Sequence, residues 1–392
     1  MERKVYFLSG SDFHHGAKEP DEMMKEFYED EMSFMNVLSS LVLDDTFKGV
    51  LITGDYYDKR ISLEDPKSKV ASKIFLDIFN MCKENDKWFI VTRGTYGHDF
   101  RQLDNFQALE LTYDKFKLIN TVTELEVDEL KILAIPEEYP ADELEYYKTY
   151  IQDVPDKYYD MIIGHGMFTH NSFDANSAER NMNKMPIMDV NTLFRVTNCI
   201  IYGHIHTHSI YKDILAYNGS YSRLCHGEEE PKGFLLTEYD LDTRKPLYNF
   251  IENVNAPIYK TIKINKIFAL PVEELTKKIE SISTTVKSLK VKIDVDLVNS
   301  DPDKVDILRE YFSNSNVIID AQRFTLKNKE TVEGILQDNS EDELESNSDL
   351  DFLLDEIAIE EKILEFAKLK HPNKIDSNLT LEFIKECISD NK

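Results

Sequence analysis

The sequence predicts a layered α/β fold, of the α+β kind, in which two β-sheets pack against each other between helices. Short apolar runs rich in β-branched residues, such as residues 50–52, are typical of buried parallel strands. Segments with helical spacing of apolar residues alternate with these runs, which is an α/β pattern. Hydrophobic residues make up 42% of the 392 residues, enough for a substantial core. We therefore expect a two-sheet sandwich flanked by helices, then a small α+β domain and C-terminal helices.

Three segments have the apolar spacing of helices, namely residues 21–43, 66–83 and 103–118. The Met and Phe side chains of the first segment are interpreted as core rather than as a ligand pocket. Alternating apolar residues over 125–134 and 214–240 predict strands on the second side of the layered fold. Asn218-Gly219 predicts a tight turn in the latter segment.

The chain is expected to divide into a first domain over residues 1–255 and a capping domain over 256–326. Residues 260–292 carry eight lysines against three glutamates in a β-α-β-like pattern, which fits either a DNA-backbone surface or ordinary solvated lysines. Residues 327–348 form an acidic and polar linker. Residues 349–392 predict two amphipathic helices, whose apolar stripe either docks in a partner's groove or packs back on the domain.

The formal net charge is -27, although proteins that bind nucleic acid usually neutralise phosphate with Lys and Arg. Bound divalent cations or a partner subunit could supply the missing positive charge. The sequence contains no apolar run of about 18 residues, the length that spans a bilayer, so no membrane association is expected. Four scattered cysteines and the lack of an export signal predict a cytoplasmic protein.

Five strand-like runs are each followed by Asp or His, which is the most informative pattern in the sequence. Because functional residues of α/β folds lie past the carboxyl ends of strands, these side chains are expected at one edge of the sheets. The runs are residues 5–8 before Asp12 and His14, 50–53 before Asp55, 88–91 before His98 and Asp99, 161–163 before His165, and 200–202 before His204 and His206.

Mixed carboxylate and imidazole ligands suit manganese, iron or zinc better than calcium or magnesium. The number of candidate ligands exceeds the need of one ion. Two ions about 3.5–4 Å apart that share one carboxylate form the usual clamp for phosphate ester hydrolysis. Asp55 is the predicted shared ligand.

The ordered motifs Asp12-x-His14, Gly54-Asp55, Gly97-His98-Asp99, Gly164-His165-Gly166 and Gly203-His204-x-His206 resemble the calcineurin-like metallophosphoesterase superfamily, and within it the SbcD-type nuclease subunit of double-strand-break repair complexes. The likeness covers about residues 4–240 and includes the stretch from Asn218 to Arg223. It implies that one metal takes Asp12, His14, Asp55 and His206, and the other Asp55, His165 and His204. His98 would position the phosphate or protonate the leaving oxygen. Asp58 would hold a ligand histidine or cap a helix, and Arg223 would support the site or contact phosphate.

The resemblance also implies an activity and partners. Family members are manganese-dependent exonucleases and endonucleases on DNA ends, usually dimers through helices near the start of the chain. Their C-terminal helices dock on the coiled coil of an SMC-like ATPase, SbcC. Two other functions stay open: a superfamily hydrolase acting on phosphoproteins or nucleotides, and a structural subunit with weakened catalysis.

The chain departs from the family pattern in one loop. Where the pattern is Gly-Asn-His-Asp, with Asn a ligand of the second metal, this chain reads Arg93-Gly94-Thr95-Tyr96-Gly97-His98-Asp99. The Thr95 hydroxyl or a water could replace the Asn, or the second metal could bind weakly. The altered loop is similar to that of phage-encoded SbcD-like proteins, which would place the protein in the cytoplasm of an infected bacterium.

Overall fold

The computed structural model describes residues 3–99, 101–137, 153–168, 187–264, 271–295 and 301–323. The chain forms two compact units: Met1–Lys260 together with Ser283–Ser288, and the described parts of the remainder from Thr261 onward. The predicted linker over 327–348 and the predicted helices over 349–392 lie outside the described residues. None of the described helices is long and apolar enough to cross a membrane.

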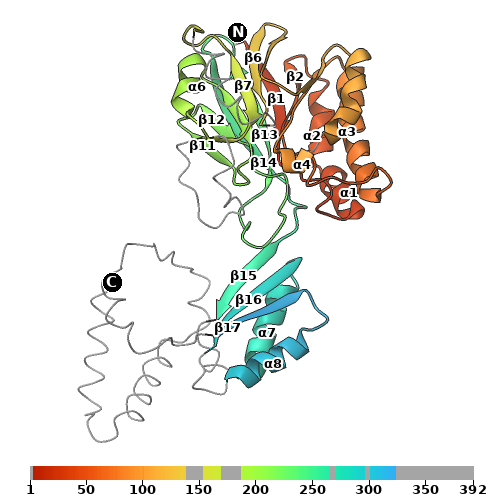
Figure 1. Cartoon of the computed structure of the whole chain (residues 1–392), viewed down its shortest axis with the longest axis vertical. Helices are drawn as coiled ribbons and strands as arrows, with labels where there is room; N and C mark the ends of the chain where they lie inside the picture. The colour runs from red at the N-terminus through yellow and green to blue at the C-terminus, as the bar shows by residue number, and fades with distance from the viewer. Residues whose placement is uncertain are drawn as a thin grey trace, which may run out of the picture. The chain divides into compact units, whose positions relative to one another are not determined.

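The first unit contains two mixed six-stranded sheets (Figure 1). In the first sheet, four parallel strands are followed at one side by an antiparallel pair, in the order β14-β13-β1-β2-β3-β4. These strands are β1 (Lys4–Gly10), β2 (Phe47–Thr53), β3 (Trp88–Thr92), β4 (Phe116–Ile119), β13 (Gly233–Asp240) and β14 (Lys245–Glu252).

The second sheet has the order β11-β12-β10-β7-β6-β5, with parallel strands at its centre and an antiparallel strand at each edge. Its strands are β5 (Thr123–Val127), β6 (Leu130–Ile135), β7 (Met161–His165), β10 (Ile200–Gly203), β11 (Ser209–Tyr211) and β12 (Leu215–Tyr217). The short strands β8 (Met167–Phe168) and β9 (Ile187–Met188) pair with each other.

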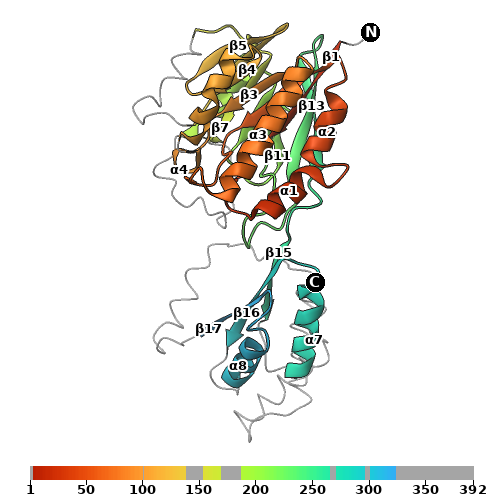
Figure 2. The same cartoon turned by 90° about the vertical axis from the view of Figure 1, so that its right-hand side faces the viewer.

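Helices cover the outer faces of both sheets, which confirms the predicted fold class. The helices α1 (Pro20–Tyr28), α2 (Phe34–Leu41) and α3 (Pro66–Glu84) lie over the first sheet, and α6 (Val190–Val196) lies on the other side of the sandwich (Figures 1 and 2). The short helix α4 (Tyr96–Asp99) and the 3-10 helix η1 (Gln102–Leu111) follow β3.

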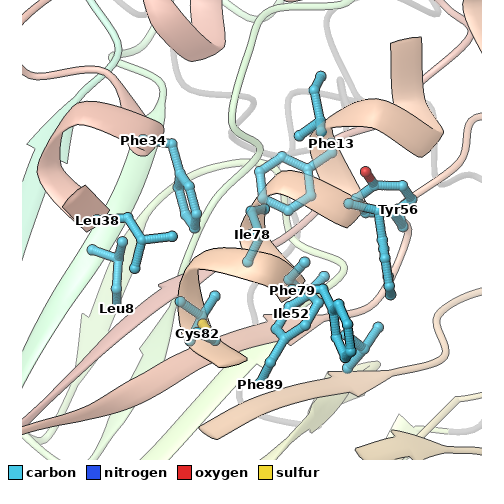
Figure 3. Packing of buried hydrophobic residues seen from close by; sticks show 14 of the residues in the cluster. Leu8, Phe13, Phe34, Leu38, Ile52, Tyr56, Ile78, Phe79, Cys82 and Phe89 are labelled. Atoms are coloured by element: carbon cyan, nitrogen blue, oxygen red, sulfur yellow. The ribbon is translucent and has the colours of Figure 1, made fainter. Parts of the chain in front are cut away.

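The alternation of side chains along each strand divides the core into layers. In β2, Val50 and Ile52 face the helices, whereas Leu51 faces the second sheet. Figure 3 shows Ile52 packed with Phe79 of α3 in the helix-facing layer. A third layer fills the space between the second sheet and α6, so central strands are buried on both faces. This is why their sequences read as continuous apolar runs.

The predicted helix over 21–43 is two helices, α1 and α2. The side chain of Asp30 accepts the backbone N–H of Met32, and the Asn36 amide donates to the carbonyls of Tyr28 and Asp30. Such local side-chain bonds compete with helical ones. The helix therefore ends near Tyr28 and restarts after Ser33.

The predicted helix over 103–118 is also wrong, because only its first part is helical. Residues Gln102–Leu111 form η1, and the chain then turns into β4. Pairing with β3 buries Phe116 and Leu118, and the Glu110 carboxylate accepts the N–H of Leu118. Tertiary burial thus overrides the local helical spacing.

The other predicted elements of the first unit are present, with two corrections: residues 214–240 do not form one layer, and Asn218-Gly219 is not a hairpin turn, because the strands on either side of it belong to different sheets. The helix predicted over 66–83 is α3, and residues 125–134 form the β5–β6 hairpin. The sequence predicts a single second layer over residues 214–240, but β12 joins the second sheet and β13 joins the first. Gly219 between them has φ +77°, the left-handed conformation that glycine favours.

The second unit contains the β-α-β pattern that the sequence predicts. Its three-stranded sheet has the order β15-β16-β17, and β16 and β17 are parallel. The elements are β15 (Tyr259–Ile264), α7 (Val272–Ser283), β16 (Ser288–Val295), α8 (Asp301–Tyr311) and β17 (Val317–Arg323).

Truncating Phe75 should destabilise the first unit strongly. Its side chain is fully buried and stacks on Phe106 with 3.9 Å between ring centroids. We expect Phe75→Ala to lower the free energy of unfolding by about 3–5 kcal/mol, and the exposed control Leu111→Ala to change it by no more than about 0.5 kcal/mol. Urea unfolding followed by the fluorescence of Trp88, the one tryptophan, measures both. Equal effects of the two variants would contradict this packing.

Candidate metal centre

The carboxyl ends of strands from both sheets meet at one edge of the sandwich. Asp12 follows β1 and donates its N–H to the carbonyl of Gly54 after β2, at 3.1 Å. His204 follows β10 and donates its N–H to Asp12 Oδ2, at 3.0 Å. The five predicted strand ends are present, and they bring the six predicted ligands into two groups that could hold a metal ion, buried except for the partly exposed His206; a third, more exposed group consists of His14, Asp58 and His98.

The first group consists of Asp12, His14 and His206, whose candidate ligand atoms lie within 4.8 Å of one another. His14 Nε2 is 3.1 Å from His206 Nε2, and His206 Nε2 is 3.8 Å from Asp12 Oδ1. At most one of two facing imidazole nitrogens can donate to the other. A cation accepts both lone pairs, so this arrangement fits a metal.

The second group consists of Asp55, His165 and His204. His165 Nδ1 lies 2.7 Å from the carbonyl oxygen of Thr53. A carbonyl only accepts, so Nδ1 carries the proton, and Nε2 faces Asp55 Oδ2 at 3.3 Å. Within the described part of the chain, neither ring nitrogen of His204 has an aligned hydrogen-bond partner. Buried nitrogens without such partners suit metal ligation.

Asp55 lies between the two groups. Its Oδ2 is 3.3 Å from His165 Nε2 and 4.0 Å from His14 Nε2. Its other oxygen, Oδ1, accepts the N–H of Thr95 at 2.6 Å. Gly94 permits this close approach, because a Cβ there would lie 2.1 Å from Asp55 Oδ1. The loop thus holds one oxygen of Asp55 and leaves the other facing both groups.

Four of the six predicted ligands have a left-handed backbone. The φ angles are +50° at Asp12, +48° at His14, +50° at Asp55 and +93° at His204. Non-glycine residues rarely adopt this conformation, and such strain concentrates at functional sites. The sharp turns after β1, β2 and β10 point these side chains into the centre.

The charges of the site shift the pKa values of its members. Burial disfavours the ionised form of Asp55, but the charge and the hydrogen bond of His165 outweigh it and hold the pKa of Asp55 well below its usual range. Burial lowers the pKa of His14 well below its ordinary value, so this imidazole is neutral and ready to bind a cation. Burial also opposes the charge of His206, but the hydrogen bond to Glu228 prevails and raises the pKa of His206 to about 9.

His98, the predicted catalytic residue, lies at the rim of the centre. Its side chain is 36% exposed, and its Nε2 is 3.9 Å from Asp55 Oδ2. Its Nδ1 is held at 2.5 Å from the backbone carbonyl of Asp58. The Asp58 carboxylate is 3.6 Å from His14 Nδ1, which is too long for a hydrogen bond. Asp58 therefore lies beside both histidines, and its support of a ligand histidine stays a prediction.

Arg223 is buried, and its guanidinium donates to the carbonyls of Ala256 and Glu229 at 3.4 and 3.5 Å. The contact with Ala256 ties the segment after β12 to the chain beyond β14. Its role toward phosphate stays a prediction.

Two glutamates at the centre were not singled out from the sequence. Glu228 Oε1 is 2.5 Å from His206 Nδ1, which orients that ring. Glu137 Oε2 is 3.1 Å from His204 Nδ1 and 3.4 Å from His165 Nε2. Glu137 follows β6 and thus repeats the strand-end pattern that identified the other residues. Glu228 lies in an acidic loop run, and nothing in the sequence marks it.

Comparison with known proteins adds little to this description. No family model and no curated protein matches the chain. Among solved structures, it is similar to a protein of unknown function from Aquifex aeolicus, with 11% sequence identity, a TM-score of 0.21, and coverage of 47% of this chain and 89% of that chain. A TM-score this low supports no conclusion about fold or function. The chemistry of the site therefore follows from its own residues.

Removing the charge of Glu228 should lower the pKa of His206. We expect the imidazole of His206 in the metal-free protein to titrate at about 9, and in Glu228→Gln to titrate closer to the ordinary value of about 6.5. The matched control is Glu230→Gln, since Glu230 bonds Thr207 and Lys232 instead. Nitrogen chemical shifts of the histidine rings, followed by NMR against pH, measure both. An unchanged pKa in Glu228→Gln would contradict the assigned contact.

Proposed function

We propose that this chain is a calcineurin-like metallophosphoesterase that hydrolyses phosphodiester bonds with two divalent metal ions, of which manganese is the expected species. The observation that carries the proposal is the pair of buried Asp and His groups on either side of Asp55. A shared carboxylate between two imidazole-rich groups is the arrangement that two-metal phosphoesterases use.

Each of the two groups would hold one cation. Asp12, His14 and His206 would hold one cation, His165 and His204 the other, and Asp55 would contact both. When bound, the two cations supply positive charge and lower the pKa of an attacking water.

His98 is placed to act on the phosphate or on the leaving group. It is the partly exposed histidine at the rim, and its Nδ1 is fixed on the Asp58 carbonyl while Nε2 faces the centre. A protonated Nε2 can hydrogen-bond a phosphate oxygen or give a proton to the leaving oxygen.

DNA is the proposed substrate, at its ends, and the chain would act as the nuclease subunit of an SbcCD-like complex. The order and spacing of the motifs support this choice, as does a separate α+β unit that follows the site in the chain. The net charge of -27 fits a subunit that depends on cations and on a partner ATPase for much of its positive charge. Docking of that ATPase on the C-terminal helices, and homodimerisation, belong to the same proposal.

Nuclease activity should depend on Asp55 and His98 in different ways. With end-labelled duplex DNA and Mn²⁺, we expect Asp55→Asn to abolish degradation and to lower the bound manganese, because it removes the shared charge. His98→Ala should slow degradation by roughly 10²–10⁴-fold and leave the bound manganese unchanged. The control Asp86→Asn changes an exposed aspartate that pairs with Lys115, and should behave as wild type.

Full degradation by Asp55→Asn would contradict the two-metal proposal. If the wild type, with and without a candidate ATPase, degrades no DNA but hydrolyses an aryl phosphodiester, the substrate is instead a nucleotide or a phosphoprotein. Hydrolysis of neither substrate by a folded, manganese-loaded protein would favour a structural subunit.

A further inference from the structure

The second ligand group offers only three protein ligands among the residues considered so far. Asp55 is shared between the groups, which leaves His165 and His204 as its own members. The family pattern places an Asn in the loop after β3, and this chain has none there. Mn²⁺ and Zn²⁺ sites commonly take four or more ligands. A nearby oxygen ligand is therefore the group to look for.

Glu137 lies where such a ligand should be. Its Oε2 is 3.1 Å from His204 Nδ1 and 3.4 Å from His165 Nε2, and Asp55 Oδ2 is 3.3 Å from the same His165 atom. Ligand atoms about 2.1 Å from one cation stand about 3.0 Å apart in octahedral geometry and about 3.4 Å apart in tetrahedral geometry. The three observed separations fall in this interval.

Direct hydrogen bonding does not account for this arrangement. Although His204 Nδ1 is within reach of Glu137, the pair is not aligned, and His165 Nε2 likewise has no aligned partner among the described residues. Both rings are nine-tenths or more buried. Unsatisfied buried nitrogens that surround a carboxylate oxygen point to a shared cation between them.

Charge leads to the same conclusion. Three buried carboxylates converge here, Asp12, Asp55 and Glu137, and none is more than 7% exposed. Carboxylates held this close and away from water repel one another and lose hydration, which costs several kcal/mol per ion unless positive charge compensates. Two divalent cations would more than balance them.

The backbone delivers Glu137 in the same way as the predicted ligands. It follows β6, and the register of β6 against β7 sets Ile135 beside Gly164, one residue before His165. Its N–H donates to the carbonyl of Arg93 at 3.2 Å, which fixes it to the altered loop. The Thr95 hydroxyl lies 3.3 Å from both Glu137 Oε2 and Asp55 Oδ2, so it can donate its one proton to either carboxylate.

We propose that Glu137 is a ligand of the second metal ion, in place of the missing Asn, and that Thr95 positions Asp55 by its backbone N–H and Glu137 by its hydroxyl. This inference rests on the proposed two-metal function. A carboxylate in place of a neutral amide adds one negative charge, so it should strengthen binding of the second ion. On this assignment, the ligand that is missing from the loop after β3 is supplied by the residue that follows β6. The altered loop is then no sign that the site has lost its function.

Manganese binding by the intact chain tests the assignment without reference to activity. Calorimetric titration and metal analysis of the wild type should give two Mn²⁺ per chain, with an electron paramagnetic resonance spectrum typical of a coupled pair. Glu137→Ala and the isosteric Glu137→Gln should keep one ion at unchanged affinity and bind the second at least about tenfold more weakly. Their spectra should show isolated Mn²⁺.

The matched control is Glu129→Gln, in the turn between β5 and β6, which pairs with Lys48 on the surface and should behave as wild type. If Glu137→Ala fails to fold, Glu137→Gln decides. Two ions bound at wild-type affinity by Glu137→Gln would overturn the assignment of Glu137 and leave the proposed phosphodiesterase intact. Fewer than two ions in the wild type would overturn the two-metal proposal itself, and the assignment with it.

Discussion

The contacts between Asp55 and the imidazoles around it are the constraint on which the first unit depends. Asp55 is almost fully buried and lies 3.3 Å from His165 Nε2. A buried carboxylate without positive partners would cost several kcal/mol, so Asp55 depends on the imidazole that the second sheet brings to it or on bound cations. Conversely, His165 bonds the carbonyl of Thr53 at the end of β2, which ties the two sheets together at this edge. The sandwich and the centre therefore stabilise each other.

Rigid strands and strained turns share the task of positioning the side chains. The strands end inside a core that is buried on both faces, so their last residues have little freedom. The left-handed residues Asp12, His14, Asp55 and His204 then aim the side chains, each at a cost on the order of 1 kcal/mol. Gly54, with φ +87°, is required because a Cβ there would lie 2.3 Å from His165 Nδ1. Such conformations persist where the surrounding structure permits no other, and the free energy of cation binding would offset their cost.

The sequence predicts the parts of this molecule that depend on local patterns, and fails where distant contacts decide. The strand ends before Asp12, Asp55 and His204 were predictable, because buried parallel strands read as apolar runs and the next polar residue must lie at the sheet edge. Glu137 satisfies the same rule after β6 and could have been found by applying it once more. The contact of Glu228 with His206 could not, because a long loop brings them together. The break between α1 and α2 and the strand β4 likewise depend on particular hydrogen bonds and on pairing with β3.

The central claim is that Asp55 is shared by two cations, and anomalous X-ray scattering from crystals grown with Mn²⁺ tests it most directly. The geometry predicts two peaks about 3.5–4 Å apart, one beside Asp12, His14 and His206, the other beside His165, His204 and Glu137, with Asp55 between them. A single peak, or a pair of peaks that Asp55 does not contact, would contradict the two-metal centre described above.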